Sequence, residues 1–92
     1  MIYLISYKVP FDLFRSLDDV ETEIKSYPGW CKCFDSAWLI ATGDDIETVS
    51  EKLAKHFEEK DLWFIAAVNE KFCGGLSKDA WDWFNDTRRK GF

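Results

Sequence analysis

The sequence predicts an α+β fold, in which a four-stranded antiparallel sheet carries two helices on one face and a further helix near the C-terminus. Three observations lead to this prediction. Two apolar runs, residues 30–34 and 37–40, meet at the two-residue step Asp35-Ser36, which is typical of a tight β-hairpin. Segments with helical spacing lie on both sides of this hairpin. Proline and glycine residues separate the segments from one another.

The first half of the chain predicts a strand and then a helix. Residues 2–9 form a largely apolar run that ends at Pro10, as expected for a strand. A helix is expected over residues 16–27, with Ser16 as its N-cap. Its apolar positions recur near the helical period, at Leu17, Val20, Ile24 and Tyr27. The pair Pro28-Gly29 ends this helix and leads into the hairpin.

The second half predicts another helix and strand. A helix is expected over residues 44–59, where Asp44 can cap the first turn and Glu47 holds the reciprocal position. Glu51 and Lys55 have the spacing of an ion pair on its solvent face. Its apolar stripe consists of Ile46, Val49, Leu53 and Phe57. Residues 62–68 are apolar without alternation, which predicts a fourth strand covered on both faces.

A last helix is expected over residues 77–88, with Ser77 as N-cap and a broad apolar face that includes Trp81 and Phe84. Trp81 and Trp83 are interpreted as residues that pack on the sheet. Two helices cover only one face of a sheet, so the other face must meet this last helix, a second subunit or both. This argument predicts a homodimer.

The element order is strand, helix, strand, strand, helix, strand, which is the ferredoxin-like arrangement, with an expected strand order of 4-1-3-2. We expect one domain over residues 1–92, with its core in 1–69 and a C-terminal extension in 70–92. Aromatic residues make up 17% of the chain, enough to fill a small core and contribute to an interface.

Charge and cysteine content exclude several classes of protein. A net charge of −5 disfavours general binding to nucleic acid, since phosphate attraction supplies most non-specific affinity. The exception is the basic group Arg88, Arg89 and Lys90, which is interpreted as a helix end that complements the helix dipole. The sequence has no apolar run long enough to cross a membrane and no signal-peptide pattern. Three cysteines do not form a disulfide framework and predict a cytoplasmic location.

No set of residues predicts a cofactor or a metal. Cys31 and Cys33 share one face of a strand and Cys73 could join them, but Cys-x-Cys is not the usual zinc spacing. These cysteines are interpreted as small buried hydrophobic residues. His56 lies at the edge of an apolar stripe without a nucleophile or carboxylate evident beside it, so a general-base role is disfavoured.

Three motifs support a resemblance to a known family. They are Tyr-Leu-Ile-Ser-Tyr at residues 3–7, Gly-Trp at 29–30 and Cys-Phe-Asp-Ser-Ala-Trp-Leu at 33–39. Together they resemble the small SinR-like proteins, which are similar in turn to the smaller CRISPR adaptation protein and to VapD-type endoribonucleases. The resemblance implies a two-subunit ferredoxin-like protein whose sheets face one another. It also implies a setting in mobile elements or defence systems.

The resemblance bears on catalysis at one position. Nuclease members of the wider superfamily carry an aspartate at the end of the first strand, where the two copies in a dimer bind Mg²⁺. This chain has Lys8 there, and an ammonium group repels Mg²⁺ rather than binding it. Asp12 is the nearest alternative carboxylate, with no second carboxylate spaced to join it.

Two function classes follow. The first is a non-catalytic homodimeric interaction or scaffold protein of the SinR-like group, whose acidic body could contact a basic protein. The alternative is a metal-dependent endoribonuclease or a nucleic-acid-binding protein. Residues proposed for interaction or nucleic-acid contact are Lys8, Asp12, Arg88, Arg89 and Lys90. Residues proposed for the subunit interface are Tyr3, Tyr7, Trp30, Trp38 and Trp81.

Overall fold

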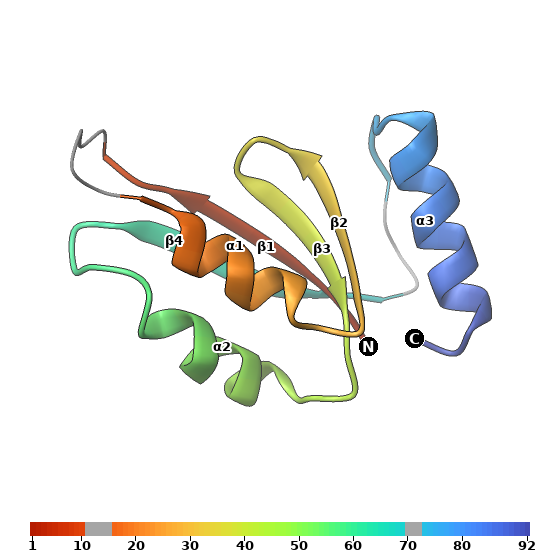
Figure 1. Ribbon diagram of the computed structural model, residues 1–92. Helices are drawn as coiled ribbons and strands as arrows, with labels where there is room; N and C mark the ends of the chain where they lie inside the picture. The colour runs from red at the N-terminus through yellow and green to blue at the C-terminus, as the bar shows by residue number, and fades with distance from the viewer. Residues whose placement is uncertain (11–15, 70–72) are drawn as a thin grey trace.

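The computed structural model describes residues 1–10, 16–69 and 73–92 and shows one antiparallel sheet with helices on both of its faces (Figure 1). The strands are β1 (Ile2–Lys8), β2 (Gly29–Phe34), β3 (Ala37–Ala41) and β4 (Leu62–Val68). The helices are α1 (Asp18–Lys25), α2 (Ile46–Ala54) and α3 (Lys78–Arg89). The strand order is β2-β3-β1-β4, which confirms the ferredoxin-like prediction.

β1 lies in the middle of the sheet and contributes side chains to both faces. It pairs antiparallel with β3, where Ile5 lies opposite Trp38, and with β4, where Ile5 lies opposite Ile65. Because successive residues of a strand alternate between faces, odd-numbered residues of β1 face α1 and α2, and even-numbered residues face the opposite side. The sheet therefore separates two apolar clusters.

The larger cluster, the main core, fills the space between the sheet and helices α1 and α2. Its fully buried members include Ile5, Ile24, Ile40, Val49 and Leu53. The smaller cluster, the α3 core, lies on the opposite face and consists of Ile2, Leu39, Ala41 and Phe84, with Leu4, Cys33, Val68, Trp81 and Trp83 packed against it. The prediction that the aromatic residues of the last helix pack on the sheet is thus confirmed.

Helix α3 approaches the sheet closely at Gly29. A Cβ added there would lie 3.1 Å from the Cβ of Ala41 and 3.4 Å from the ring of Trp83. A side chain at position 29 would therefore crowd Ala41 and Trp83 and require a shift of a few tenths of an ångström. Glycine at this position lets the C-terminal half of α3 pack tightly against the sheet.

The observed helix starts correct two predicted N-caps. Ser77 caps α3 as predicted, and its hydroxyl accepts from the N–H of Ala80. The cap of α2 is Asp45 rather than Asp44, because the Asp45 carboxylate accepts from the N–H of Thr48. Helix α1 begins at Asp18 without a side-chain cap on its first turn, and the Ser16 hydroxyl accepts from the neighbouring N–H of Asp18 instead.

Candidate interaction surface

Part of the second sheet face is exposed in the described part of the chain. Helix α3 covers the half formed by the start of β1 and the end of β3, but the half near the end of β1 faces solvent. Here Leu62 is 67% exposed and Phe64 is 66% exposed. Ser6 pairs with Phe64 and Lys8 pairs with Leu62, so these four side chains share this face. We call Ser6, Lys8, Ser36, Leu62 and Phe64 the open face; they line a shallow depression.

The open face shows that the predicted covering of both faces of β4 is incomplete within one chain. Val68, at one end of β4, packs against the α3 core, whereas Leu62 and Phe64 lie beyond the reach of that helix. The expected covering by residues 77–88 is therefore only partial within one chain. Two large apolar side chains on adjacent positions of one face form a candidate contact for another molecule.

The residues predicted for a subunit interface lie elsewhere. Tyr3, Tyr7 and Trp38 are buried in the main core beneath α1 and α2, which corrects their proposed interface role. The indole N–H of Trp38 donates to the Tyr7 hydroxyl at 3.1 Å. The Tyr3 hydroxyl donates to the carbonyl of Asp44 at 2.8 Å. These side chains already have partners within one chain and little surface to offer a second.

The two other tryptophans are also engaged within the chain. Trp30 shares a face with Trp38, and their ring centroids are 6.0 Å apart, which confirms that the two flank the hairpin on one side of the sheet. Trp30 remains 41% exposed, with the ammonium of Lys25 5.3 Å from its ring centroid. Trp81 packs at the α3 core and meets Phe84 edge to face. Of the predicted interface residues, Trp30 alone is exposed.

The predicted basic contacts do not form one surface. Lys8 lies at the end of β1, whereas α3 ends near the start of that strand and the C-terminus (Figure 1). A seven-residue strand is about 23 Å long, so Lys8 and the basic end of α3 lie far apart. Arg88 donates to the carbonyl of Asn69, and Arg89 pairs with Asp86 at 2.9 Å. Lys90 is exposed at the C-cap of α3.

Acidic and metal-binding residues give no assembled site within the described ranges. Asp12 lies outside the described residues. Across residues 1–10, 16–69 and 73–92, no group of three or more histidine, cysteine, aspartate or glutamate side chains could hold a metal ion. None of the helices described is both long and apolar enough to cross a membrane.

Cys31 and Cys33 project toward α3 and are only half-buried, not fully buried as predicted. Burial raises the pKa of both thiols, and burial together with the neighbouring Cys31 raises the pKa of Cys33 to about 11. Cys73 is exposed. Because the thiolate is the reactive form, a raised pKa lowers reactivity at neutral pH.

We therefore expect iodoacetamide at about pH 8 to modify Cys73 first in the folded protein, with Cys31 and Cys33 slower by about tenfold or more. Raising the pH toward the pKa of Cys33 should accelerate its modification. Peptide mapping by mass spectrometry measures the three rates. Unfolding in guanidinium is the control and should make the rates similar. Equal rates in the folded protein would contradict the burial of the strand cysteines.

Comparison of the chain with protein-family models, with curated proteins and with solved structures gives no match.

Sequence reasoning did not name Leu62 and Phe64 among the interface residues. It used the continuous apolar run only to predict that the last helix or a second subunit covers β4. The available signal was positional, because β4 is the last strand and pairs with β1 at an edge of the predicted sheet order. Apolar residues on the outer face of an edge strand are the ones that a single neighbouring helix leaves uncovered.

Proposed function

We propose that this chain is a non-catalytic homodimeric interaction protein of the SinR-like group, and that two copies pack their open faces together. The observation that carries the proposal is the exposure of Leu62 and Phe64 on one face of the sheet, at 67% and 66%. Burying an aromatic or aliphatic side chain of this size contributes about 1.5–3 kcal/mol. A two-fold axis would bury both side chains in each of the two copies, so each contribution to the stability of the dimer counts twice.

The chemistry of the open face supports packing rather than catalysis. Its polar members are Ser6, Lys8 and Ser36, which offer hydroxyl groups and one ammonium group. Hydroxyl and ammonium groups can form hydrogen bonds at the rim of an apolar contact. The superfamily nucleases resembled by this chain use a carboxylate at the position of Lys8. We accordingly assign no reaction to the chain and place it, as part of the proposal, in the cytoplasm.

The test is sedimentation of a Leu62→Ser/Phe64→Ser variant at micromolar concentrations. Removing both apolar contacts from each copy is expected to weaken the dimer at least about a hundredfold, because the two-fold axis doubles every loss. Phe92→Ser is the control, since Phe92 is 37% exposed but lies beyond the end of α3, away from the open face. This control should remain a dimer.

Two results would overturn the proposal. The wild-type protein could sediment as a monomer throughout the micromolar range, or the double variant could remain as dimeric as the Phe92→Ser control. Mg²⁺-dependent cleavage of RNA that survives stringent purification and is lost in Asp12→Ala would instead favour an endoribonuclease.

A further inference from the structure

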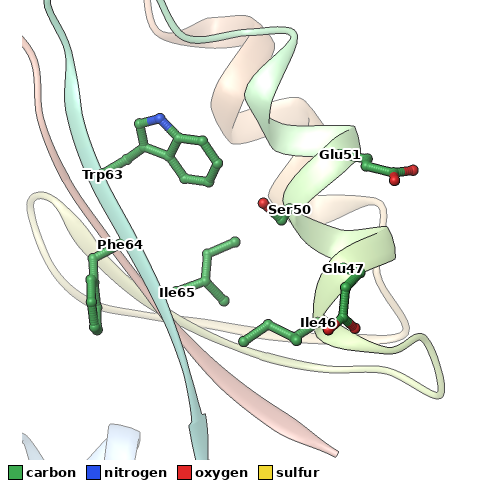
Figure 2. Close-up of a pocket in the computed structure, with 7 residues that line it drawn as sticks. All are labelled: Ile46, Glu47, Ser50, Glu51, Trp63, Phe64 and Ile65. Atoms are coloured by element: carbon green, nitrogen blue, oxygen red, sulfur yellow. The ribbon is translucent and has the colours of Figure 1, made fainter.

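A groove of about 470 Å³ lies between α2 and β4, on the helix side of the sheet, and shares Phe64 at its border with the open face (Figure 2). Figure 2 shows Trp63 and Ile65 projecting from β4 toward α2, whereas Phe64 points away from the helix. The residues that line the groove are Ile46, Glu47, Ser50, Glu51, Trp63, Phe64 and Ile65. The groove thus has an apolar floor and a helical wall with two carboxylates.

The backbone of β4 offers hydrogen-bonding groups along this groove. The N–H of Tyr7 donates to the carbonyl of Ser36 at 3.1 Å, so odd-numbered residues of β1 direct their backbone groups toward β3. The even-numbered residues then bond to β4, where Ser6 lies opposite Phe64. By the same alternation, every second residue of β4 directs its N–H and C=O outward. These residues are Trp63, Ile65 and Ala67.

Nothing in the sequence of β4 protects this edge from another strand. Leu62–Val68 contains no charged residue and no proline, the two commonest devices that keep an edge strand from pairing. The opposite edge differs, because β2 carries Lys32 in its middle and is irregular between Lys32 and Phe34. The β4 edge is therefore the one suited to accept an added strand.

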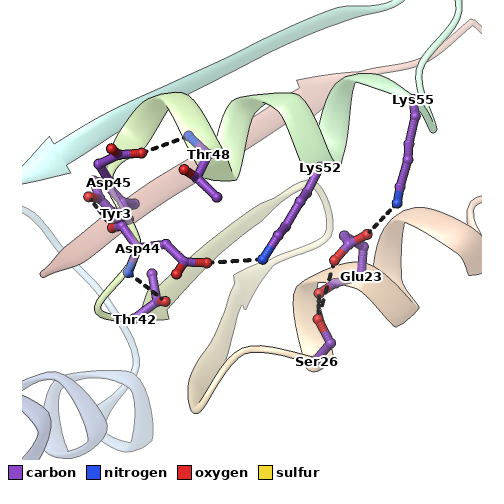
Figure 3. Close-up of polar contacts among 9 residues, drawn as sticks. All are labelled: Tyr3, Glu23, Ser26, Thr42, Asp44, Asp45, Thr48, Lys52 and Lys55. Carbon is purple, nitrogen blue, oxygen red and sulfur yellow. Dashed lines mark hydrogen bonds and ion pairs between the residues drawn. The ribbon is translucent and has the colours of Figure 1, made fainter.

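Helix α2 distributes its charges unequally between its two sides. Lys52 pairs with Asp44, in the loop before the helix, at 3.1 Å, and Lys55 pairs with Glu23 of α1 at 3.7 Å (Figure 3). The predicted pair between Glu51 and Lys55 is not formed, because Lys55 reaches the carboxylate of α1 instead. The cations of α2 are thus engaged on the side away from the groove.

The groove side of α2 carries Glu47 and Glu51, both exposed. No salt bridge among the described residues involves either carboxylate. A second copy that paired along β4 would bring two more carboxylates toward this wall, and like charges repel. A segment with lysine or arginine would instead meet charges of opposite sign. The charge of the wall favours a basic occupant over another copy of the chain.

The wall is also held in place before any ligand arrives. The Tyr3 hydroxyl fixes the chain before α2 through the carbonyl of Asp44, and Asp45 caps the first turn (Figure 3). Glu23 joins the end of the helix to α1 through Lys55 and His56. A preformed groove requires little ordering on binding, which favours affinity.

We propose that an extended basic peptide segment of a partner protein adds to β4 as a fifth strand and lies in this groove. Its backbone bonds to the outward groups of β4. Side chains at alternate positions face α2, where a central apolar residue contacts Ile65 and flanking basic residues reach Glu47 and Glu51. The inference rests on the proposed role as an interaction protein but does not depend on the dimer, whose contact lies on the other face.

The probe is a fluorescein-labelled peptide, Lys-Thr-Leu-Thr-Lys, flanked by threonines and followed by fluorescence anisotropy with the full chain. Micromolar binding that weakens with added salt is expected. A peptide with glutamate in place of lysine tests the charge, and a peptide N-methylated at the leucine tests the backbone bonds. Both control peptides should bind at least about tenfold more weakly.

Paired variants of the protein locate the site. Ala67→Pro removes one outward N–H at an exposed position and should weaken binding about tenfold, whereas Ala67→Thr keeps the N–H and should bind normally. Glu47→Gln/Glu51→Gln should weaken binding by about three- to tenfold. The control Asp82→Asn/Asp86→Asn removes the same charge from α3 and should have no effect.

Several outcomes would overturn the inference. Ala67→Pro and Ala67→Thr could bind the peptide equally, or both peptide controls could bind as well as the probe. A dimer that is lost in Ala67→Pro but kept in Leu62→Ser/Phe64→Ser would show that a second copy occupies the edge. A monomer that still binds the basic peptide would refute the proposed dimer and leave the groove assignment intact.

Discussion

Replacing Trp38 with alanine is expected to lower the free energy of unfolding by about 3–5 kcal/mol, because this side chain is the largest fully buried one in the described structure. The substitution leaves a cavity in the main core and removes the partner of the Tyr7 hydroxyl. For a chain of 92 residues, this loss corresponds to a fall in Tm of more than about 10 °C. Thermal unfolding followed by circular dichroism measures it.

Trp38→Phe is the matched control, because it keeps an aromatic ring in the core and removes the indole N–H. Its smaller expected cost is about 1–3 kcal/mol, for the lost hydrogen bond and the reduced volume. If Trp38→Ala retained the wild-type Tm, the hairpin would not anchor the main core, and its role would have to be sought in binding.

The second large effect is expected for Phe84→Ala, which removes the only side chain of α3 that belongs to the buried centre of the α3 core. The expected loss is again about 3–5 kcal/mol. Because α3 meets the sheet through few buried residues, the helix should loosen before the main core does. The half-buried thiols of Cys31 and Cys33, which lie on the same face, should then react faster with iodoacetamide.

A control for this variant is Phe92→Ala, since Phe92 is 37% exposed beyond the end of α3. It should unfold at nearly the wild-type temperature and leave the two thiols slow to react. Faster thiol modification in Phe84→Ala without a change in the protection of main-core amides would identify α3 as a separate unit of unfolding. A variant with unchanged Tm and unchanged thiol rates would contradict the packing described for α3.

Most of the fold could be predicted from local patterns. The two-residue step at Asp35-Ser36 identified the hairpin, and Ser77 identified the start of α3. The predicted N-cap of α2 was wrong because two residues that can cap a helix are adjacent, and the sequence does not distinguish Asp44 from Asp45. The Tyr3 hydroxyl bonds to the carbonyl of Asp44, a long-range contact that no local pattern contains.

The candidate surfaces were harder to predict because they depend on what each helix leaves uncovered. Aromatic content predicted an interface at Tyr3, Tyr7 and Trp38, but the alternation of side chains along β1 and β3 places them beneath α1 and α2. Phe84 packs against Ile2 and Leu39, which are distant from it in the sequence. This packing decides which half of the second face α3 covers. Leu62 and Phe64 lie in the half that α3 does not cover and are therefore exposed.

The central position of β1 has a consequence for the order in which the sheet can be completed. β1 precedes every other strand in the sequence, yet its pairing with β4 joins Ile2 to Val68 across most of the chain. Closing so long a loop costs more entropy than closing the hairpin of β2 and β3. A ribosome-bound chain that has not yet reached Leu62 leaves one edge of β1 unpaired, so β1 cannot pair on both edges until residues 62–68 have been made.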